Sequence, residues 1–386
     1  MSPRAGRVLP DLPAEAWLVA LSGLPGVGPA RLRGLVAAWG PAGAWARLVD
    51  GAPLAHPALE AAAQGRLAGL VADWRQAARA FDPAACWERH VAAGVQVLVR
   101  GGPGFPEALL DDPDSPEVLF ARGDPAVLDR TCVAIVGTRR CTRYGHDTAR
   151  RLGRELAEAG VAVVSGLARG IDGAAHTGAL AAVSGAPPVG VVGSGLDIAY
   201  PRAHRGLWRE IGGSGLLLSE SPLGAGPEPW RFPARNRIIA ALSRVVVVVE
   251  SPGSGGALLT ATEAATRSVE VMAVPGPITS RASAGTNQLL AEGAQVAVDT
   301  ASVLQLAGVA LPPGAVRSAV PAGSAPPGPD ACALLDAFGH EARTLAELAE
   351  RFPWPVGRLA AALSELEGAG AVRRRGGWFE PSAVDR

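Results

Sequence analysis

The sequence predicts an α/β fold with an extended Rossmann-like, doubly wound and mostly parallel sheet. Three observations lead to this fold class: short continuous apolar runs, helical patterns between them, and glycine-rich loops after several runs. The clearest run is the five valines at 245–249. Continuous apolar runs are typical of parallel strands buried on both faces, and alternation of strand with helix is typical of a doubly wound sheet.

The first part of the chain lacks this alternation. Residues 1–90 are rich in Ala, Leu and Trp at helical spacing, with almost no β-branched runs, which predicts an N-terminal helical domain. Residues 91–130 carry one short strand pattern at 95–99, followed by a segment rich in turn residues.

Six further strand patterns begin after residue 131, and helical patterns at 145–159, 171–182 and 203–211 separate the first four. The strand patterns lie at 132–136, 161–164, 189–192, 216–218, 245–249 and 271–274. We therefore expect a Rossmann-like core over residues 91–310.

The last part of the chain predicts a second folded domain. Residues 311–330 are rich in Pro, Gly, Ala and Ser, which predicts a flexible linker. Three helical patterns follow, and a basic hairpin with Gly376 and Gly377 at its turn ends the series. We expect a winged-helix domain over 331–386.

Composition excludes several functions. The 36 basic and 36 acidic side chains cancel, so any basic surface must be local. All basic residues are arginines, which excludes a phosphate-loop lysine and a Schiff-base lysine. The 4 cysteines lie far apart, which argues against a metal site or disulfides and favours the cytoplasm. Without an apolar stretch long enough to cross a membrane, we expect no membrane partner.

Two loops carry the residue types that bind phosphate. Gly137-Thr138-Arg139 follows the strand pattern at 132–136, and the segment Ser165 to Asp172 follows the next. Glycines allow backbone N–H groups to approach an anion, and arginine offers a planar pair of donors. The glycines could instead serve only tight turns, and Asp172 could be a helix cap.

A third segment, Trp230 to Arg237, interleaves aromatic residues with arginines. This pattern suits a single nucleic-acid strand, because rings stack on bases while guanidinium groups hold the backbone. The alternative is a helix start in which Phe232 packs inward. No nucleophile accompanies His146, His176 or His204 in an elbow motif, so we expect no catalytic residues, no cofactor and no enzyme activity.

Together these loops resemble the DNA-processing protein A (DprA, or Smf) family. The matching segments are GTR at 137–139, SGLARGID at 165–172, GSGLDIAYP at 193–201, SESP at 219–222, FPARNRIIAALS at 232–243, LLTA at 258–261, AVPG at 273–276 and GTNQLLAEGA at 285–294. Leu24 to Gly28 looks like the helix-hairpin-helix motif that often begins this family. The chain departs from the family pattern at Gly255 to Ala257 and at Arg267-Ser268.

The resemblance implies a protein of natural transformation that protects incoming single-stranded DNA and loads RecA recombinase onto it, usually as a homodimer. It also implies that the DNA groove is lined by Gly137, Thr138, Arg139, Ser165, Gly166, Arg169, Gly170, Asp172, Phe232, Arg235 and Asn236. Candidates for the self-association and RecA surfaces are Leu258, Leu259, Met272, Leu289 and Leu290.

Two other functions stay open. Pro252 to Gly256, with Glu263 further along, loosely matches the P-G-G-x-G-T-x-x-E motif of nucleotide phosphoribohydrolases, although the threonine and glutamate are out of register. The basic hairpin at 373–375 would also fit a winged-helix transcription regulator.

Overall fold

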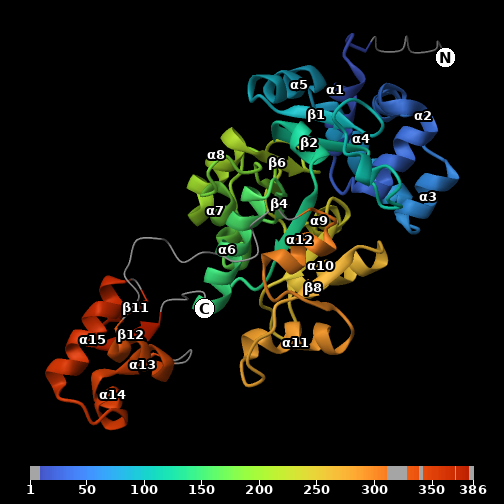
Figure 1. Ribbon diagram of the computed structural model, residues 1–386. Coiled ribbons are helices and arrows are strands. Elements are labelled where there is room, and N and C mark those ends of the chain that lie inside the picture. The colour runs from blue at the N-terminus through green and yellow to red at the C-terminus, as the bar shows by residue number, and fades with distance from the viewer. Residues whose placement is uncertain (1–8, 311–327, 339–341, 370, 382–386) are drawn as a thin grey trace, which may run out of the picture. The chain divides into compact units, whose positions relative to one another are not determined.

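The chain divides into two compact units, Met1–Leu311 and Pro312–Arg386. The structure, a computed structural model, describes residues 9–310, 328–338, 342–369 and 371–381 (Figure 1). Most of the linker predicted at 311–330 falls at 311–327, outside the described residues.

Within the described part of the first unit, nine strands form one sheet in the order β1-β2-β6-β5-β4-β3-β7-β8-β9. The strands β3 to β9 run parallel, and β1 and β2 pair antiparallel at one edge. Their bounds are β1 Gln96–Val99, β2 Val118–Gly123, β3 Cys132–Val136, β4 Ala162–Ser165, β5 Val189–Val192, β6 Leu216–Ser219, β7 Val245–Val248, β8 Glu270–Ala273 and β9 Gln295–Val296. The predicted fold class is confirmed.

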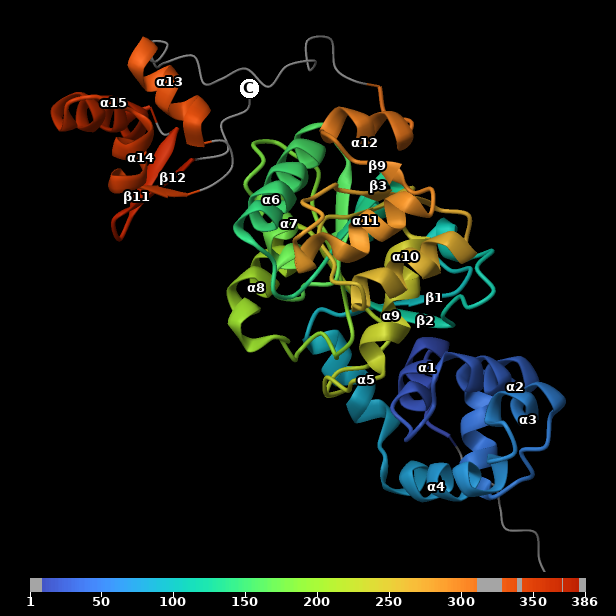
Figure 2. The ribbon, with the colours of Figure 1, turned by 90° about the horizontal axis from the view of Figure 1, so that it is seen from below.

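Helices cover both faces of this sheet, which explains why the strand sequences are continuously apolar. Val245 and Val247 of β7 pack with α6 (Arg143–Glu158), α7 (Ile171–Leu180) and α12 (Thr300–Leu306). Val246 and Val248 pack on the other face with α9 (Arg231–Ala241) and α10 (Gly256–Thr266). Successive side chains of a strand point to opposite faces, so each valine finds an apolar layer. Figure 2 shows the two helical layers.

Two further helices complete this part of the unit: α8 (Arg205–Ser214), which packs on β2 and β6, and α11 (Ala284–Ala291), which packs on β8. In Figure 1, α10 to α12 lie at the opposite end of the unit from α1 to α4.

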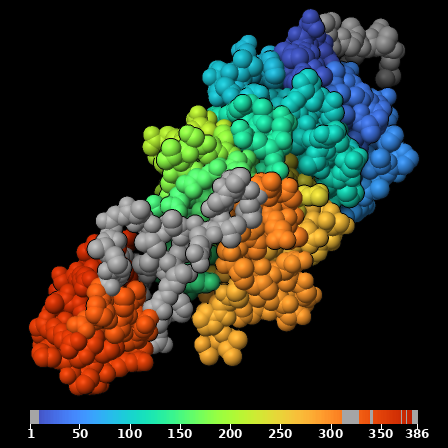
Figure 3. Space-filling model, in the orientation of Figure 1, coloured from blue at the N-terminus to red at the C-terminus, as the bar shows by residue number. Residues whose placement is uncertain are grey.

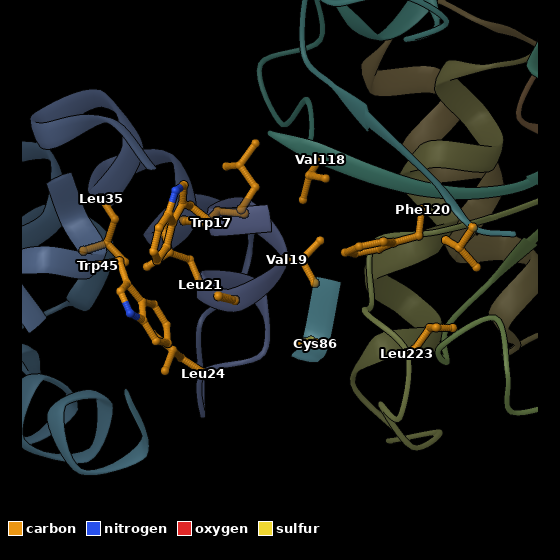
Figure 4. Close-up of a cluster of buried hydrophobic side chains, with 14 of the residues drawn as sticks. Trp17, Val19, Leu21, Leu24, Leu35, Trp45, Cys86, Val118, Phe120 and Leu223 are labelled. Carbon is orange, nitrogen blue, oxygen red and sulfur yellow. The ribbon is translucent and has the colours of Figure 1, made fainter. Parts of the chain in front are cut away.

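From residue 9 onward, where the description begins, five helices precede the sheet: α1 Ala14–Ser22, α2 Pro29–Asp50, α3 Pro57–Ala63, α4 Leu67–Ala80 and α5 Pro83–Ala92. They do not form a separate unit. Trp17 and Val19 of α1 share one buried cluster with Val118 and Phe120 of β2 and with Leu223 (Figure 4). The helical segment and the sheet also form one continuous surface (Figure 3). The shared core holds the turn between α1 and α2 beside the sheet.

Over its described residues, the second unit has the predicted outline of three helices and a hairpin. Its helices are α13 Pro329–Phe338, α14 Leu345–Arg351 and α15 Val356–Gly368, and its strands are β10 Arg343–Thr344, β11 Val372–Arg375 and β12 Trp378–Pro381. Gly376 and Gly377 have positive φ at the hairpin turn, as that turn requires. Among the described residues, no helix is both long and apolar enough to cross a membrane.

Candidate nucleic-acid interface

The two glycine-rich loops lie against each other at the carboxyl end of the parallel strands. The amide of Ile171, at the start of α7, donates to the carbonyl of Thr138 at 3.3 Å. Gly170 has a φ of +77°, and a Cβ at this position would overlap that same carbonyl oxygen. Only glycine fits both the backbone conformation and the close approach. The loop after β3 and the loop after β4 therefore form one surface.

Asp172 lies beneath this surface and fixes the loop after β4. Its buried carboxylate accepts hydrogen bonds from the amides of Gly166 at 3.2 Å and Ala168 at 3.4 Å. Burial raises the pKa of Asp172, while the positive charge of Arg235 acts against that rise. The carboxylate thus orients the loop after β4, and does not lie at the molecular surface.

Arg235 lies directly under the same loop. Its Nη2 donates to the carbonyl of Gly166 at 2.8 Å, and a Cβ on Gly166 would overlap the guanidinium group. Burial lowers the pKa of Arg235 to about 10, and the Asp172 carboxylate opposes this shift. The Arg235 side chain is only 7% exposed, so it supports the loop after β4 from inside and does not present its charge to solvent.

The side chains of two more predicted residues donate hydrogen bonds to backbone carbonyl groups of neighbouring elements. The hydroxyl of Ser165 is buried and donates to the carbonyl of Ile135 at 2.6 Å, which joins β4 to β3. The side-chain amide of Asn236 donates to the carbonyl of Gly256 at 3.3 Å, which joins α9 to the start of α10. Ser165 offers no surface hydroxyl to a ligand in this arrangement.

The surface itself is formed by aromatic and arginine side chains. The guanidinium carbon of Arg139 lies 5.5 Å from the centre of the Phe232 ring. The Tyr200 ring lies on Phe232 too, with 5.2 Å between ring centres, and is 41% exposed. Arg139 and Arg169 are exposed, and Thr138 and Phe232 are half-buried. This cluster unites residues from the loops after β3 and β5 with the first turn of α9.

Sequence reasoning did not single out Tyr200, although it lies in the segment GSGLDIAYP. It also missed Glu250, which follows β7. The buried carboxylate of Glu250 accepts from the Thr142 amide at 2.8 Å and from the Thr142 hydroxyl, and thereby fixes the end of the Arg139 loop. The signal available for Tyr200 was an aromatic residue a few positions after the glycine-rich loop that follows a predicted strand.

Two histidines near these loops lie within hydrogen-bond distance of backbone carbonyl groups. Nε2 of His176 lies 3.1 Å from the carbonyl of Val189, and burial lowers the pKa of His176 to about 4. Nδ1 of His204 lies 3.0 Å from the carbonyl of Leu167. In the part of the chain that the structure describes, no cluster of three His, Cys, Asp or Glu side chains could hold a metal ion.

Comparison with known proteins connects this chain to one family. The family model described as DNA recombination-mediator protein A matches residues 96–308, and the model described as DprA winged helix domain matches 318–377. Protein Smf of Synechocystis sp. is 35% identical over 289 residues, which cover 73% of this chain and 70% of that protein.

Two solved structures agree with this relationship. DNA processing protein A from Streptococcus pneumoniae aligns with a TM-score of 0.59 at 30% identity, over 76% of this chain and 96% of that one. DNA processing protein A from Helicobacter pylori, described as having a unique single-stranded DNA binding mode, aligns with a TM-score of 0.50 at 32% identity, over 55% of this chain and 94% of that one.

Proposed function

Because the chain belongs to the DNA recombination-mediator protein A family, we propose that it binds single-stranded DNA at the carboxyl edge of its sheet. The observation that carries this proposal is the group formed by the exposed Arg139 and Tyr200 with the half-buried Phe232. Rings at such a position can stack on unpaired bases, and adjacent guanidinium groups can hold the phosphates. The single-stranded DNA binding described for the Helicobacter pylori relative supports the same ligand.

The two exposed arginines give the first test. Replacing Arg139 or Arg169 with alanine is expected to weaken single-strand binding. Each change should also make the log–log salt dependence shallower by about 0.7 if one phosphate contact is lost. Fluorescence anisotropy titrations at several salt concentrations measure this slope. Arg244→Ala is the control, because Arg244 is exposed but precedes β7 at the opposite edge. Unchanged slopes in both site variants would place these arginines off the DNA path.

The biological role that we propose is protection of incoming single strands in natural transformation and loading of RecA onto them. Family membership supports this role. We place it in the cytoplasm, which agrees with the wide spacing of the four cysteines along the chain. We also propose that the chain is not an enzyme, because the carboxylates nearest the loops are engaged, Asp172 with loop amides and Glu250 with Thr142. Assay for hydrolysis of AMP checks this point.

We further propose that the chain acts as a homodimer, because two linked grooves on one strand raise the effective concentration of the second contact. Among the candidate residues, Met272 is buried in the sheet core, whereas Leu259 is 49% exposed and Leu290 is half-buried. Arg267, where the chain departs from the family pattern, donates to Asp112 at 2.6 Å and lies against that loop. The RecA-facing surface that we propose adjoins Leu259 and Leu290.

Sedimentation tests the dimer. The unmodified chain is expected to sediment as a dimer at micromolar concentration, and Leu290→Glu is expected to shift it to monomer because the charge would be buried in the contact. Val183→Glu is the control, since Val183 is 86% exposed and lies outside the candidate surface. A chain that stays monomeric at these concentrations, yet stimulates RecA assembly on coated single strands, contradicts the dimer requirement.

A further inference from the structure

Three exposed arginines lie on one face of α8 and of the short 3₁₀ helix that precedes it. Arg202 begins the 3₁₀ helix, and Arg205 and Arg209 lie in α8. The spacing of three and then four residues places these side chains on one face. Trp208 and Ile211 are buried on the opposite side of the helix. None of the DNA-binding features described so far includes these arginines.

Neighbouring carboxylates do not neutralise this face. Among the residues that the structure describes, none of the three arginines forms an ion pair. The helix α8 contains one acidic residue, Glu210. In the loop before α8, the carboxylate of Asp197 instead accepts from the amide of Gly224 at 2.9 Å. A group of exposed and unpaired positive charges attracts an anionic ligand.

The start of α8 adjoins the candidate interface. Tyr200, whose ring lies on Phe232, is two positions before Arg202. Nδ1 of His204 lies 3.0 Å from the carbonyl of Leu167, in the loop after β4 that also carries the exposed Arg169. The helix α8 also lies beside α7, which that loop begins (Figures 1 and 2). The arginine face therefore continues the surface formed by the two glycine-rich loops.

The chemistry of the face suits a chain of phosphates. Each guanidinium group offers a planar pair of donors that matches a phosphate. At about 1.5 Å per helical residue, the seven positions from Arg202 to Arg209 extend over roughly 10 Å, so the charges form a line. The aromatic residue of α8, Trp208, is only 4% exposed. The face thus offers contacts to a nucleic-acid backbone and no ring for a base.

We propose that the single strand continues from Phe232 and Tyr200 along α8, where Arg202, Arg205 and Arg209 bind its phosphates. The inference rests on the proposed function and gives the strand a direction across the molecule. Contacts to phosphates carry no sequence information, so binding along α8 should not depend on the bases.

The double variant with Arg205→Ala and Arg209→Ala tests this path. Both side chains are exposed and alanine favours helix, so the fold should not change. Single-strand sites of proteins without sequence preference hold about 4–16 nucleotides, so oligonucleotides of about 4 and about 16 bracket the site. The short strand can occupy the stacking rings alone, and its binding should change far less than that of the long strand.

The long strand should show the loss of two phosphate contacts. The log–log salt slope should become shallower by about 1.4, which is about 0.7 for each contact. Raising the salt concentration fourfold should then narrow the affinity difference between the original chain and the double variant about sevenfold. Arg130→Ala with Arg244→Ala is the matched control, because both arginines are exposed and precede β3 and β7 at the opposite edge of the sheet.

Gly213→Arg tests the same face by adding a charge. Gly213 lies four positions after Arg209, no atom lies within 4 Å of a Cβ built there, and arginine favours helix over glycine. The variant should bind the long strand more tightly, with a slope steeper by about 0.7. Gly69→Arg adds the same charge to α4, where a Cβ also meets no atom within 4 Å, and should leave the slope unchanged.

The outcomes separate this inference from the proposed function. If the original chain binds the long strand and the α8 variants equal it in affinity and slope, the path along α8 is wrong and the proposed function stands. An equal change in the control variants would attribute the effect to net charge and would also overturn the path. If the original chain binds neither strand, the proposed function fails together with the inference.

Discussion

Arg235→Ala is expected to lower the free energy of unfolding by about 3–5 kcal/mol, the usual cost of leaving a buried charge without its compensating charge. The side chain is 7% exposed and holds the Gly166 carbonyl, and its charge is the main influence that counters the cost of burying Asp172. Without it, Asp172 remains as a buried carboxylate with no compensating cation. Urea unfolding of the two proteins at equal pH measures the difference.

A double variant makes this expectation specific. Replacing Arg235 with methionine and Asp172 with asparagine removes both charges and keeps similar volumes, so much of the lost stability should return. The asparagine oxygen can still accept from the loop amides. Recovery indicates that charge compensation is the cause, and a double variant as unstable as Arg235→Ala would mean that packing or the Gly166 contact dominates.

Phe232→Ala is expected to cost about 1–3 kcal/mol of single-strand binding, the usual loss when a stacking ring is removed. Because Phe232 is half-buried, the free energy of unfolding should fall by less than the roughly 3–5 kcal/mol of a fully buried phenylalanine. One preparation serves both measurements, DNA titration and thermal melting.

The control for this variant is Trp39→Ala. Trp39 lies in α2, half-buried, with the guanidinium carbon of Arg47 5.2 Å from its ring centre. The variant therefore removes a similar arginine–aromatic contact outside the candidate interface and should leave DNA binding unchanged. A large melting loss in Phe232→Ala with undiminished DNA binding would show that the ring serves packing alone.

The sheet was predictable because its signal is local. Val245 to Val248 are buried on both faces, so their sequence is apolar without alternation, and the same holds for β3 to β6. The strand β2 was missed because turn residues precede it and it pairs at the antiparallel edge. The strand β9 has two residues, too few for any pattern.

The roles within the segment from 230 to 237 were harder to predict because the sequence left open whether a helix starts there. The helix begins at Arg231, and its buried residues are Arg235, Arg237, Ile238, Ile239 and Ala240. Arg235 is buried because it lies one helical turn before Ile238 and Ile239, whereas Phe232 and Asn236 stay half-buried. The alternation of aromatic residues with arginines in the sequence does not reveal this difference in burial.

Other parts of the interface depend on contacts between distant residues. Glu250 holds Thr142 because β7 lies beside β3 in the sheet, so the two strand ends meet although 108 positions separate these residues. Tyr200 reaches Phe232 from the loop after β5. Neither pairing has a signal in residue spacing.

Direct comparison of single-stranded and double-stranded DNA of equal length and sequence, at one salt concentration, tests the central claim most closely. The protein should bind the single strand more tightly, because stacking on Phe232 and Tyr200 requires unpaired bases. Equal or tighter binding of the duplex would contradict this account, and would transfer DNA recognition to the second unit, where Arg373 and Arg374 lie in β11.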